Sequence, residues 1–263
     1  MKEQILSQLS AECPWRDTLL WFDTIDSTNT KAKELAASGA PHGTVVVAGT
    51  QTGGRGRLGR SFSSPAGLGM YLSVILRPGC RPDQLMHLTC AAAVAACDAV
   101  EKAAGFRPRI KWTNDLVCGK QKLGGILTEL SVNSQSGLVD FAIIGIGINC
   151  LQAKEDFPAE LQETATSIHT VSGKAVSPAV MACAVIESLV QMDLSSKEAI
   201  MGQYKKDCMT LGKQIVVVRG DQTQYGVAED LDADGGLVVR FPDGTVKTVT
   251  SGEVSVRGMY GYV

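Results

Sequence analysis

Residues 123–148 read LGGILTELSVNSQSGLVDFAIIGIGI, and this stretch decides the fold. It contains two apolar runs, Leu123 to Leu130 and Leu138 to Ile148, separated by a short segment rich in Asn, Ser and Gly. Apolar runs of this length bounded by turn residues predict two neighbouring β-strands. Arg109 to Trp112 predicts another strand shortly before them.

The sequence before residue 109 predicts three more strands and two helices. Ser27 is expected to cap the start of one helix and Gly39 to end it, because a hydroxyl favours a helix start and glycine favours a helix end. The alanine-rich stretch Leu85 to Ala104 has the composition and length of a buried helix. The three strands are expected over Leu19 to Ile25, Thr44 to Ala48 and Met70 to Leu76.

A further helix is predicted to begin at Pro178. Ser177 stands at its cap, and proline is well suited to the first helical position. Apolar residues recur behind it at helical spacing and predict one inward face, formed by Met181, Val185, Leu189 and Met192.

From about Gly212 the sequence changes to short alternating runs. Asp232 to Gly236 and Pro242-Asp243-Gly244 are strong hairpin turn signals between them. Five short strands in about fifty residues indicate a small barrel of SH3-like type, so we expect domains over 1–211 and 212–263. The strands are expected at Ile215 to Val218, Gln224 to Glu229, Leu237 to Phe241, Thr245 to Val249 and Val254 to Val256.

Composition excludes several classes of protein. The 263 residues are 44% apolar and 20% charged with a formal net charge of -2, which is ordinary for a globular protein and gives no general attraction to nucleic acid. The N-terminal segment Met1 to Ser10 lacks the apolar core of a secretory signal, and Leu88 to Val100 is too short to cross a bilayer. We therefore expect a cytoplasmic protein.

Eight cysteines are scattered along the chain without a C-x-x-C pair or a histidine at zinc-ligand spacing. This pattern indicates reduced thiols, several of them small core residues, and neither a metal cage nor a disulfide framework.

The segment Gly54-Arg55-Gly56-Arg57-Leu58-Gly59 matches the dinucleotide-binding pattern G-x-G-x-x-G. That motif requires a helix to begin within it and an acidic residue about 20 positions later. Here a Ser- and Pro-containing loop follows, and position 79 is glycine. A glycine-hinged loop carrying Arg55, Arg57 and Arg60 instead suits the binding of phosphate or carboxylate, although a solvated basic loop is the alternative.

Five segments together resemble the biotin protein ligases in their order and spacing. They are Ser27-Thr28-Asn29, Gln51-x-x-Gly54-Arg55-Gly56-Arg57, Lys111-Trp112-Thr113-Asn114-Asp115, Lys122-Leu123-Gly124-Gly125-Ile126-Leu127 and Gly145-Ile146-Gly147-Ile148-Asn149. The resemblance extends from about Trp21 to Val256. It implies an α+β fold with a mixed-sheet catalytic domain of the biotin/lipoate protein ligase type and a small C-terminal SH3-like β-barrel.

The resemblance also implies the biotin-binding residues. A ureido group offers N–H donors and a carbonyl acceptor that hydroxyl and amide side chains can match. Three of these residues have an alternative, purely structural interpretation. Ser27 is then only a helix cap, Gln51 a surface loop amide and Lys122 a lysine at the end of a strand. The implied biotin-binding residues are Ser27, Thr28, Asn29, Gln51, Arg55, Gly56, Arg57 and Lys122.

The implied nucleotide-binding residues overlap with this set. Two interpretations remain for each of two residues: Trp112 is either a core residue or part of the site, and Asn149 is either a strand-end turn residue or a contact to the nucleotide. The resemblance places Lys122, Arg57 and Asp115 in catalysis, with Asp115 as a candidate proton acceptor. The nucleotide-binding residues are Arg55, Arg57, Lys111, Asn114, Lys122 and Asn149.

The implied reaction has two steps. Biotin and ATP, with Mg²⁺ on the phosphates, give biotinyl-5'-AMP and pyrophosphate. A lysine of a biotin carboxyl carrier domain then takes biotin and releases AMP. A lipoate or octanoate ligase or acyltransferase of the same fold is the alternative.

The sequence departs from the family pattern at three points. Thr113 stands where proline is common, and Phe62 where tryptophan is common. Only some twenty residues precede the first predicted strand, too few for the helix-turn-helix of many bacterial members, so we expect no specific DNA binding.

Overall fold

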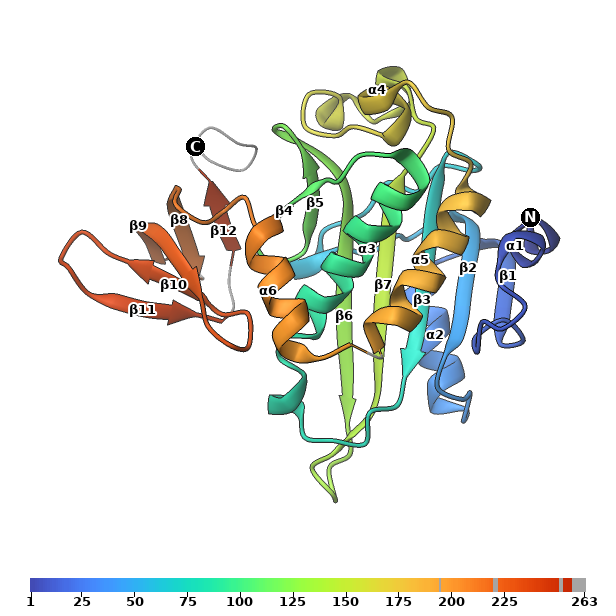
Figure 1. The fold of residues 1–263 in the computed structure, drawn as a ribbon, viewed down its shortest axis with the longest axis horizontal. Helices are drawn as coiled ribbons and strands as arrows, with labels where there is room; N and C mark the ends of the chain where they lie inside the picture. Colours follow the sequence, from blue (N-terminus) through green and yellow to red (C-terminus); the bar gives the residue numbers. More distant parts are fainter. Residues whose placement is uncertain (194, 220–221, 251–252, 257–263) are drawn as a thin grey trace.

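The computed structural model describes residues 1–193, 195–219, 222–250 and 253–256. A seven-stranded sheet with the order β1-β2-β3-β7-β6-β5-β4 forms its larger part (Figure 1). β1 and β2 pair in parallel and every other neighbouring pair is antiparallel, which confirms the predicted mixed sheet. The strands are β1 (Leu19–Ile25), β2 (Thr44–Gln51), β3 (Gly69–Leu76), β4 (Arg109–Lys111), β5 (Asp115–Cys118), β6 (Gln121–Val132) and β7 (Val139–Asn149).

Helices cover both faces of this sheet. α3 and α5 pack on one face against each other and against β3 and β6, whereas α2 contacts β2, β3 and β7. Figure 1 shows α3, α5 and α6 in front of the sheet. The helices are α1 (Lys2–Gln8), α2 (Thr28–Ala37), α3 (Leu88–Ala104), α4 (Ile168–Ser172), α5 (Pro178–Asp193) and α6 (Lys197–Asp207), with 3₁₀ turns at Arg57–Gly59, Pro82–Leu85, Lys154–Asp156 and Ala159–Leu161.

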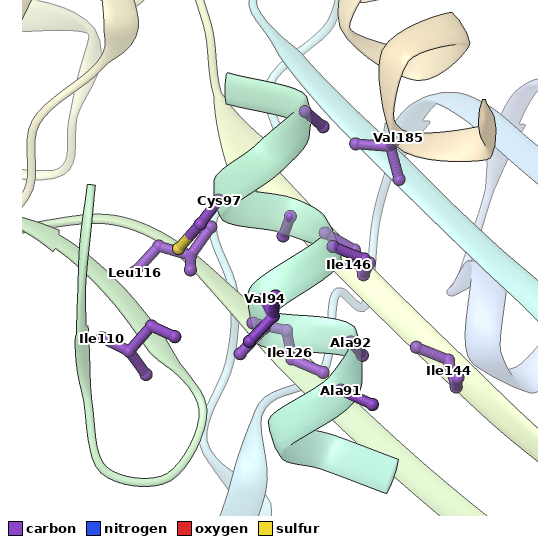
Figure 2. Close-up of a cluster of buried hydrophobic side chains, with 14 of the residues drawn as sticks. Ala91, Ala92, Val94, Cys97, Ile110, Leu116, Ile126, Ile144, Ile146 and Val185 are labelled. Carbon is purple, nitrogen blue, oxygen red and sulfur yellow. The ribbon is translucent and has the colours of Figure 1, made fainter. Parts of the chain in front are cut away.

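The two faces have different cores because side chains of a strand alternate between faces. On β7, Ile144 and Ile146 belong to the large core, in which α3 brings Ala91 and Ala92 close to the sheet (Figure 2). Ile143 belongs instead to a small cluster under α2. This cluster does not include residues of β7 beyond Ile143, and Asn29 and Phe62 lie over the glycines that follow on this face.

The C-terminal strands form a second, five-stranded antiparallel sheet with the order β11-β10-β9-β8-β12. All five predicted strands and both predicted turns are confirmed. The large core continues into this sheet through Ile215 and Leu237, and the boundary at residue 212 stays a prediction. The strands are β8 (Gln214–Arg219), β9 (Gln222–Leu231), β10 (Leu237–Arg240), β11 (Val246–Val249) and β12 (Glu253–Val256).

Other sequence predictions had mixed outcomes. The inward face of α5 is confirmed, since Met181, Val185, Leu189 and Met192 are buried. α3 begins at Leu88, three residues later than predicted, because a separate 3₁₀ turn precedes it. α1, α4, α6 and the four-residue strand β5 were not predicted.

Five of the eight cysteines are buried, which confirms that several are core residues. Burial raises the pKa of Cys90 and Cys150 to about 12, so these thiols stay protonated at neutral pH. Within the described ranges, the helices lack the length and apolar character that a membrane crossing requires.

Candidate active site

A cleft lies at the sheet between the start of α2, the Gly-Arg loop of residues 52–64 and strands β6 and β7. Trp112 and Val254 also contribute to its lining. Val254 lies on β12, so the C-terminal sheet provides part of the wall. The cleft brings together eleven of the twelve predicted site residues, Ser27, Thr28, Asn29, Gln51, Arg55, Gly56, Arg57, Lys111, Asn114, Asp115 and Lys122.

Two glycines of β7 make room for the side chains that cover the sheet here. A Cβ at Gly145 would lie 1.9 Å from Asn29 Oδ1, and a Cβ at Gly147 would lie 2.6 Å from Cε1 of Phe62. Both contacts are far shorter than van der Waals distance. The Gly-Ile-Gly-Ile pattern of the strand therefore has a packing reason, with isoleucines in the core and glycines under the cleft.

Buried polar side chains form one end of the cleft. Thr28 and Asn29, both 4% exposed, occupy the first turn of α2. Ser73, on β3, lies with its Oγ 2.7 Å from Thr28 Oγ1 and 2.6 Å from Asn29 Oδ1. Ser27 occupies the cap position as predicted, but its side chain makes no capping hydrogen bond and lines the cleft.

Gln51 joins this polar end to the Gly-Arg loop. Its Oε1 accepts hydrogen bonds from the Thr28 backbone at 2.8 Å and from Thr28 Oγ1 at 3.1 Å, and its Nε2 donates to Ser64 Oγ at 2.8 Å. A surface amide with no fixed role does not fit this geometry, because both ends of the amide are oriented within the cleft.

The Gly-Arg loop folds back on itself as a closed hairpin rather than leading into an α-helix, which agrees with the rejection of a dinucleotide-binding motif. Gly56 N donates to Arg60 O at 2.7 Å and Phe62 N donates to Gly54 O at 2.8 Å. A Cβ at Gly54 would lie 2.3 Å from Phe62 O, so the turn requires glycine there.

Arg57 connects the loop to the β4–β5 turn across the cleft. Its Nη1 donates to Asn114 Oδ1 at 3.0 Å and to Thr113 Oγ1 at 3.2 Å. Thr113, a departure from the family pattern, thus supplies a hydroxyl contact that proline lacks. Asn114 is itself fixed, since its Nδ2 donates to Ile126 O at 3.0 Å.

Phe62, the second departure, keeps an aromatic ring over the sheet. The ring lies against Gly147 and makes an edge-on contact with Tyr71, with ring centroids 6.4 Å apart. An aromatic cover of this kind keeps part of the cleft apolar.

Lys122 and Asp115 form an ion pair inside the cleft, with Lys122 Nζ 2.6 Å from Asp115 Oδ1. Gly125 allows the lysine to lie flat against β6, because a Cβ there would stand 3.3 Å from Lys122 Nζ. A strand-end lysine extending into solvent does not describe this residue. Lys111, 6% exposed, lines the same part of the cleft.

Trp112 serves both core and cleft. It is 4% exposed, and its Nε1 donates to Gly235 O of the second sheet at 2.8 Å. Its backbone N–H donates to Thr210 Oγ1 at 2.9 Å. The residue therefore attaches the C-terminal sheet to the side of the cleft.

Asn149 is the predicted site residue that the structure does not bring into the cleft lining. It is 5% exposed, its Nδ2 donates to Thr166 O at 2.9 Å, and its Oδ1 accepts from Gln152 Nε2 at 3.3 Å. These bonds hold the segment after β7, which is the role of a strand-end residue. A contact of Asn149 to nucleotide stays a prediction.

Sequence reasoning missed Glu129, on β6. Its Oε2 accepts from Asn29 Nδ2 at 2.8 Å, and its Oε1 lies 3.4 Å from Arg55 Nη2 and also pairs with Lys33. Burial raises the pKa of Glu129, but the contacts with Lys33, Asn29 and Arg55 outweigh it and hold the pKa below its usual value. Strand alternation was the available signal, because it places residues 125, 127 and 129 on one face.

Comparisons with known proteins identify the family. The model of the biotin/lipoate A/B protein ligase family matches residues 21–149, and that of the biotin protein ligase C-terminal domain matches residues 210–257. The chain is 35% identical to the bifunctional ligase/repressor BirA of Bacillus spizizenii, covering 90% of this chain and 74% of that protein. It is 32% identical to the biotin--[acetyl-CoA-carboxylase] ligase of Mycobacterium tuberculosis, covering 94% and 91%.

Solved structures give the same result. The biotin protein ligase of Aquifex aeolicus in complex with biotin and ATP superposes with a TM-score of 0.76 at 29% identity, covering 91% of this chain and 98% of that one. Sequence, fold and the residues gathered in the cleft agree, and the chain belongs to the biotin protein ligase family.

Proposed function

We propose that this chain activates biotin with ATP to form biotinyl-5'-AMP and pyrophosphate, and then transfers biotin to a lysine of a biotin carboxyl carrier domain, releasing AMP. The observation that carries this proposal is one cleft with a polar, uncharged end at Thr28, Asn29 and Gln51 and a cationic end at Arg57 and Lys122. The Aquifex relative was solved with both biotin and ATP, which supports the same pair of substrates here.

The polar end suits the ring system of biotin. A ureido group needs acceptors for its N–H groups and donors for its carbonyl, which hydroxyl and amide side chains supply. Ser27, Thr28, Asn29 and Gln51 would hold this group, and Phe62 would cover the apolar part of the ligand. A lipoyl or octanoyl chain has no ureido group and would leave the polar groups of this end unmatched.

The cationic end suits the first reaction step. The biotin carboxylate attacks the α-phosphorus, the bond to the bridging oxygen breaks, and pyrophosphate leaves. Two anions must approach each other, so Arg55, Arg57 and Lys122 would offset their repulsion and stabilise the charge that develops on the phosphoryl oxygens. Lys111 and Asn114 would contact the nucleotide from β4 and the turn after it.

In the second step the neutral amine of the acceptor lysine attacks the acyl carbon of the mixed anhydride and AMP leaves. The acceptor lysine is mostly protonated near pH 7 and must lose a proton before attack. Asp115 would accept that proton once Lys122 has turned from it to the adenylate. Their ion pair within the cleft supports this assignment.

Magnesium would enter as part of the substrate MgATP. Within the described ranges no group of three or more His, Cys, Asp or Glu side chains is arranged to hold a metal ion. The ATP phosphates would therefore supply its ligands, and the metal would offset phosphate charge.

Two further expectations stay predictions. BirA of Bacillus spizizenii is named a repressor as well as a ligase, whereas we propose ligase activity without specific DNA binding for this chain. A gel-shift titration with DNA from the chain's own promoter, with and without biotin, tests this. A cytoplasmic location is the other expectation.

One assay tests the proposed activity. ATP–pyrophosphate exchange is measured with biotin, lipoate or octanoate supplied in turn, followed by label transfer to a carrier domain. We expect exchange with biotin and labelling of a single lysine. Exchange with lipoate or octanoate but not with biotin would reject the proposal in favour of the alternative acyl ligase.

A further inference from the structure

Glu129 contacts both the polar end of the cleft and the Gly-Arg loop. Its side chain is 19% exposed and lies on the same face of β6 as the cleft floor. One carboxylate oxygen, Oε2, accepts the hydrogen bond from Asn29 Nδ2 at 2.8 Å. The other, Oε1, faces the cations of Lys33 and Arg55. Each oxygen thus serves a different group of partners.

An ionised carboxylate is an acceptor only, so it fixes the orientation of the Asn29 amide. The NH₂ group of Asn29 faces Glu129 and Leu127 O, and its Oδ1 faces Ser73 Oγ at 2.6 Å. Gly145 permits this position, because a Cβ there would lie 1.9 Å from Asn29 Oδ1.

Hydrogen bonds link Asn29 to the rest of the polar end. Ser73 Oγ also contacts Thr28 Oγ1, and Thr28 donates to Gln51 Oε1. Gln51 Nε2 donates to Ser64 Oγ, which in turn donates to Phe62 O at 3.0 Å. Glu129 and Leu127 O therefore orient the Asn29 amide at one end, and the Thr28 backbone N–H orients the Gln51 amide at the other. The hydroxyls of Ser73 and Thr28, with one proton each, link the two ends.

We propose that Glu129 is a positioning residue for biotin binding, because it orients the Asn29 amide at the polar end and tethers Arg55 of the Gly-Arg loop. This inference rests on the proposed function. Glu129 does not itself line the cleft. It acts through Asn29 and Arg55, so we expect its loss to raise the KM for biotin more than the KM for ATP, and to slow the first step only through Arg55.

The variant Glu129→Gln separates this role from a general contribution of charge. A glutamine has one acceptor oxygen and one NH₂ group. In one arrangement the glutamine oxygen faces Asn29, and the glutamine NH₂ group then faces the cations of Lys33 and Arg55. In the other, the glutamine oxygen faces the cations, and its NH₂ group then faces the NH₂ group of Asn29. Either arrangement disturbs one side, whereas Glu129→Asp keeps the charge and both acceptors on a shorter side chain.

The experiment measures ATP–pyrophosphate exchange and melting temperature for the full chain. For Glu129→Gln we expect the KM for biotin to rise at least about tenfold, the KM for ATP to stay within about twofold, and Glu129→Asp to recover part of the loss. Two controls keep the wild-type KM for biotin. Glu163→Gln is the same substitution in an exposed ion pair with Lys154, and Lys33→Met removes only the outer partner.

Three results would overturn the inference: a KM for biotin within twofold of wild type in Glu129→Gln, an equal rise in the KM for both substrates, or the same rise in Lys33→Met. The same measurements distinguish failure of the proposed function from failure of this inference. A wild-type chain without biotin-dependent exchange would reject the proposed function and, with it, the role of Glu129. An active wild-type chain with an unchanged KM for biotin in Glu129→Gln would reject only the role of Glu129.

Discussion

Lys122 Nζ lies 2.6 Å from Asp115 Oδ1, so the cation and the carboxylate that we place at the reaction centre pair with each other. Both side chains are partly buried, at 32% and 16% exposed. We expect phosphate that enters the cleft to compete with Asp115 for the lysine. Under the proposed mechanism, the pair would then provide one side chain for each half-reaction.

The first prediction concerns Asp115→Asn. We expect transfer from preformed adenylate to the carrier domain to slow by about a hundredfold, because no carboxylate then accepts the lysine proton. Adenylate formation should change by less than about tenfold, since Lys122 remains to contact phosphate. Single-turnover measurements of each half-reaction test this, with Asp83→Asn as a surface control. Equal slowing of both half-reactions would assign Asp115 to holding Lys122 alone.

The second prediction concerns Arg57→Ala. Removal of a charge-assisted contact to the adenylate phosphate should weaken its retention by about 1.5 to 3 kcal/mol, or roughly ten- to a hundredfold. Released adenylate would then label lysines of a bystander protein, while Arg55 and Lys122 preserve part of the first step. The measurements are adenylate dissociation rate, bystander labelling and melting temperature. Arg81→Ala, an arginine 74% exposed outside the cleft, is the control. An unchanged dissociation rate without bystander labelling would limit Arg57 to its structural contacts with Thr113 and Asn114.

The third prediction concerns Gly145→Ala. Its Cβ would lie 1.9 Å from Asn29 Oδ1, so Asn29 must move out of its hydrogen bonds. We expect a cost of about 1 to 3 kcal/mol in unfolding free energy and a rise of at least about tenfold in the Kd for biotin. Gly202→Ala in α6 is the matched control, because no atom lies within 4 Å of its Cβ position. Biotin titration calorimetry and urea unfolding distinguish the two variants, and wild-type affinity in Gly145→Ala would contradict the packing argument.

The fourth prediction concerns Trp112→Phe. This change leaves the buried carbonyl of Gly235 without its donor, at a cost of about 1 to 3 kcal/mol. Because the bond joins the two sheets, the C-terminal sheet should also become more sensitive to protease. Trp21→Phe removes an exposed indole hydrogen bond to Asp23 and should cost less than about 1 kcal/mol. The hypothesis fails if both variants lose the same stability in urea.

The fifth prediction concerns pH. The pKa of Glu129 in the folded chain lies below its ordinary value of 4.5, since its contacts with Lys33, Asn29 and Arg55 outweigh the opposing effect of burial. A lowered folded pKa contributes stability that is fully present above 4.5 and is lost as pH falls through the folded value. The difference in melting temperature between wild type and Glu129→Gln should therefore be constant near neutrality and shrink in acid. A gap that stays constant into acid would show that the charge of Glu129 adds no stability.

Much of the fold was predictable because its strands are long and bounded by clear turn residues. The runs around Leu19, Val74 and Ile144 have strong β signals, and Pro178 marks a helix start. α6 was missed because its buried residues, Ile200, Met201 and Tyr204, form only a narrow stripe in an otherwise polar sequence. β5 was missed because four residues are too few for alternation to show.

The residues of the candidate site likewise fall into those that the sequence predicted and those that it did not. Residues within compact motifs, such as Thr28 and Arg57, were predicted to lie together and do so. Asn149 ended its motif but is turned to the segment after β7. Glu129 could not be selected from sequence, since its role depends on Lys33 and Asn29, about a hundred residues away, meeting it across the sheet.

Val254 lies within the last strand described and also lines the cleft, while the β9–β10 turn of the same sheet holds Trp112. During synthesis, the motifs that we propose bind both substrates leave the ribosome more than a hundred residues before this strand. A growing chain thus carries the reactive groups well before it has the wall that encloses them. Completion of the polypeptide, rather than completion of its motifs, sets the moment at which a reactive anhydride can be enclosed.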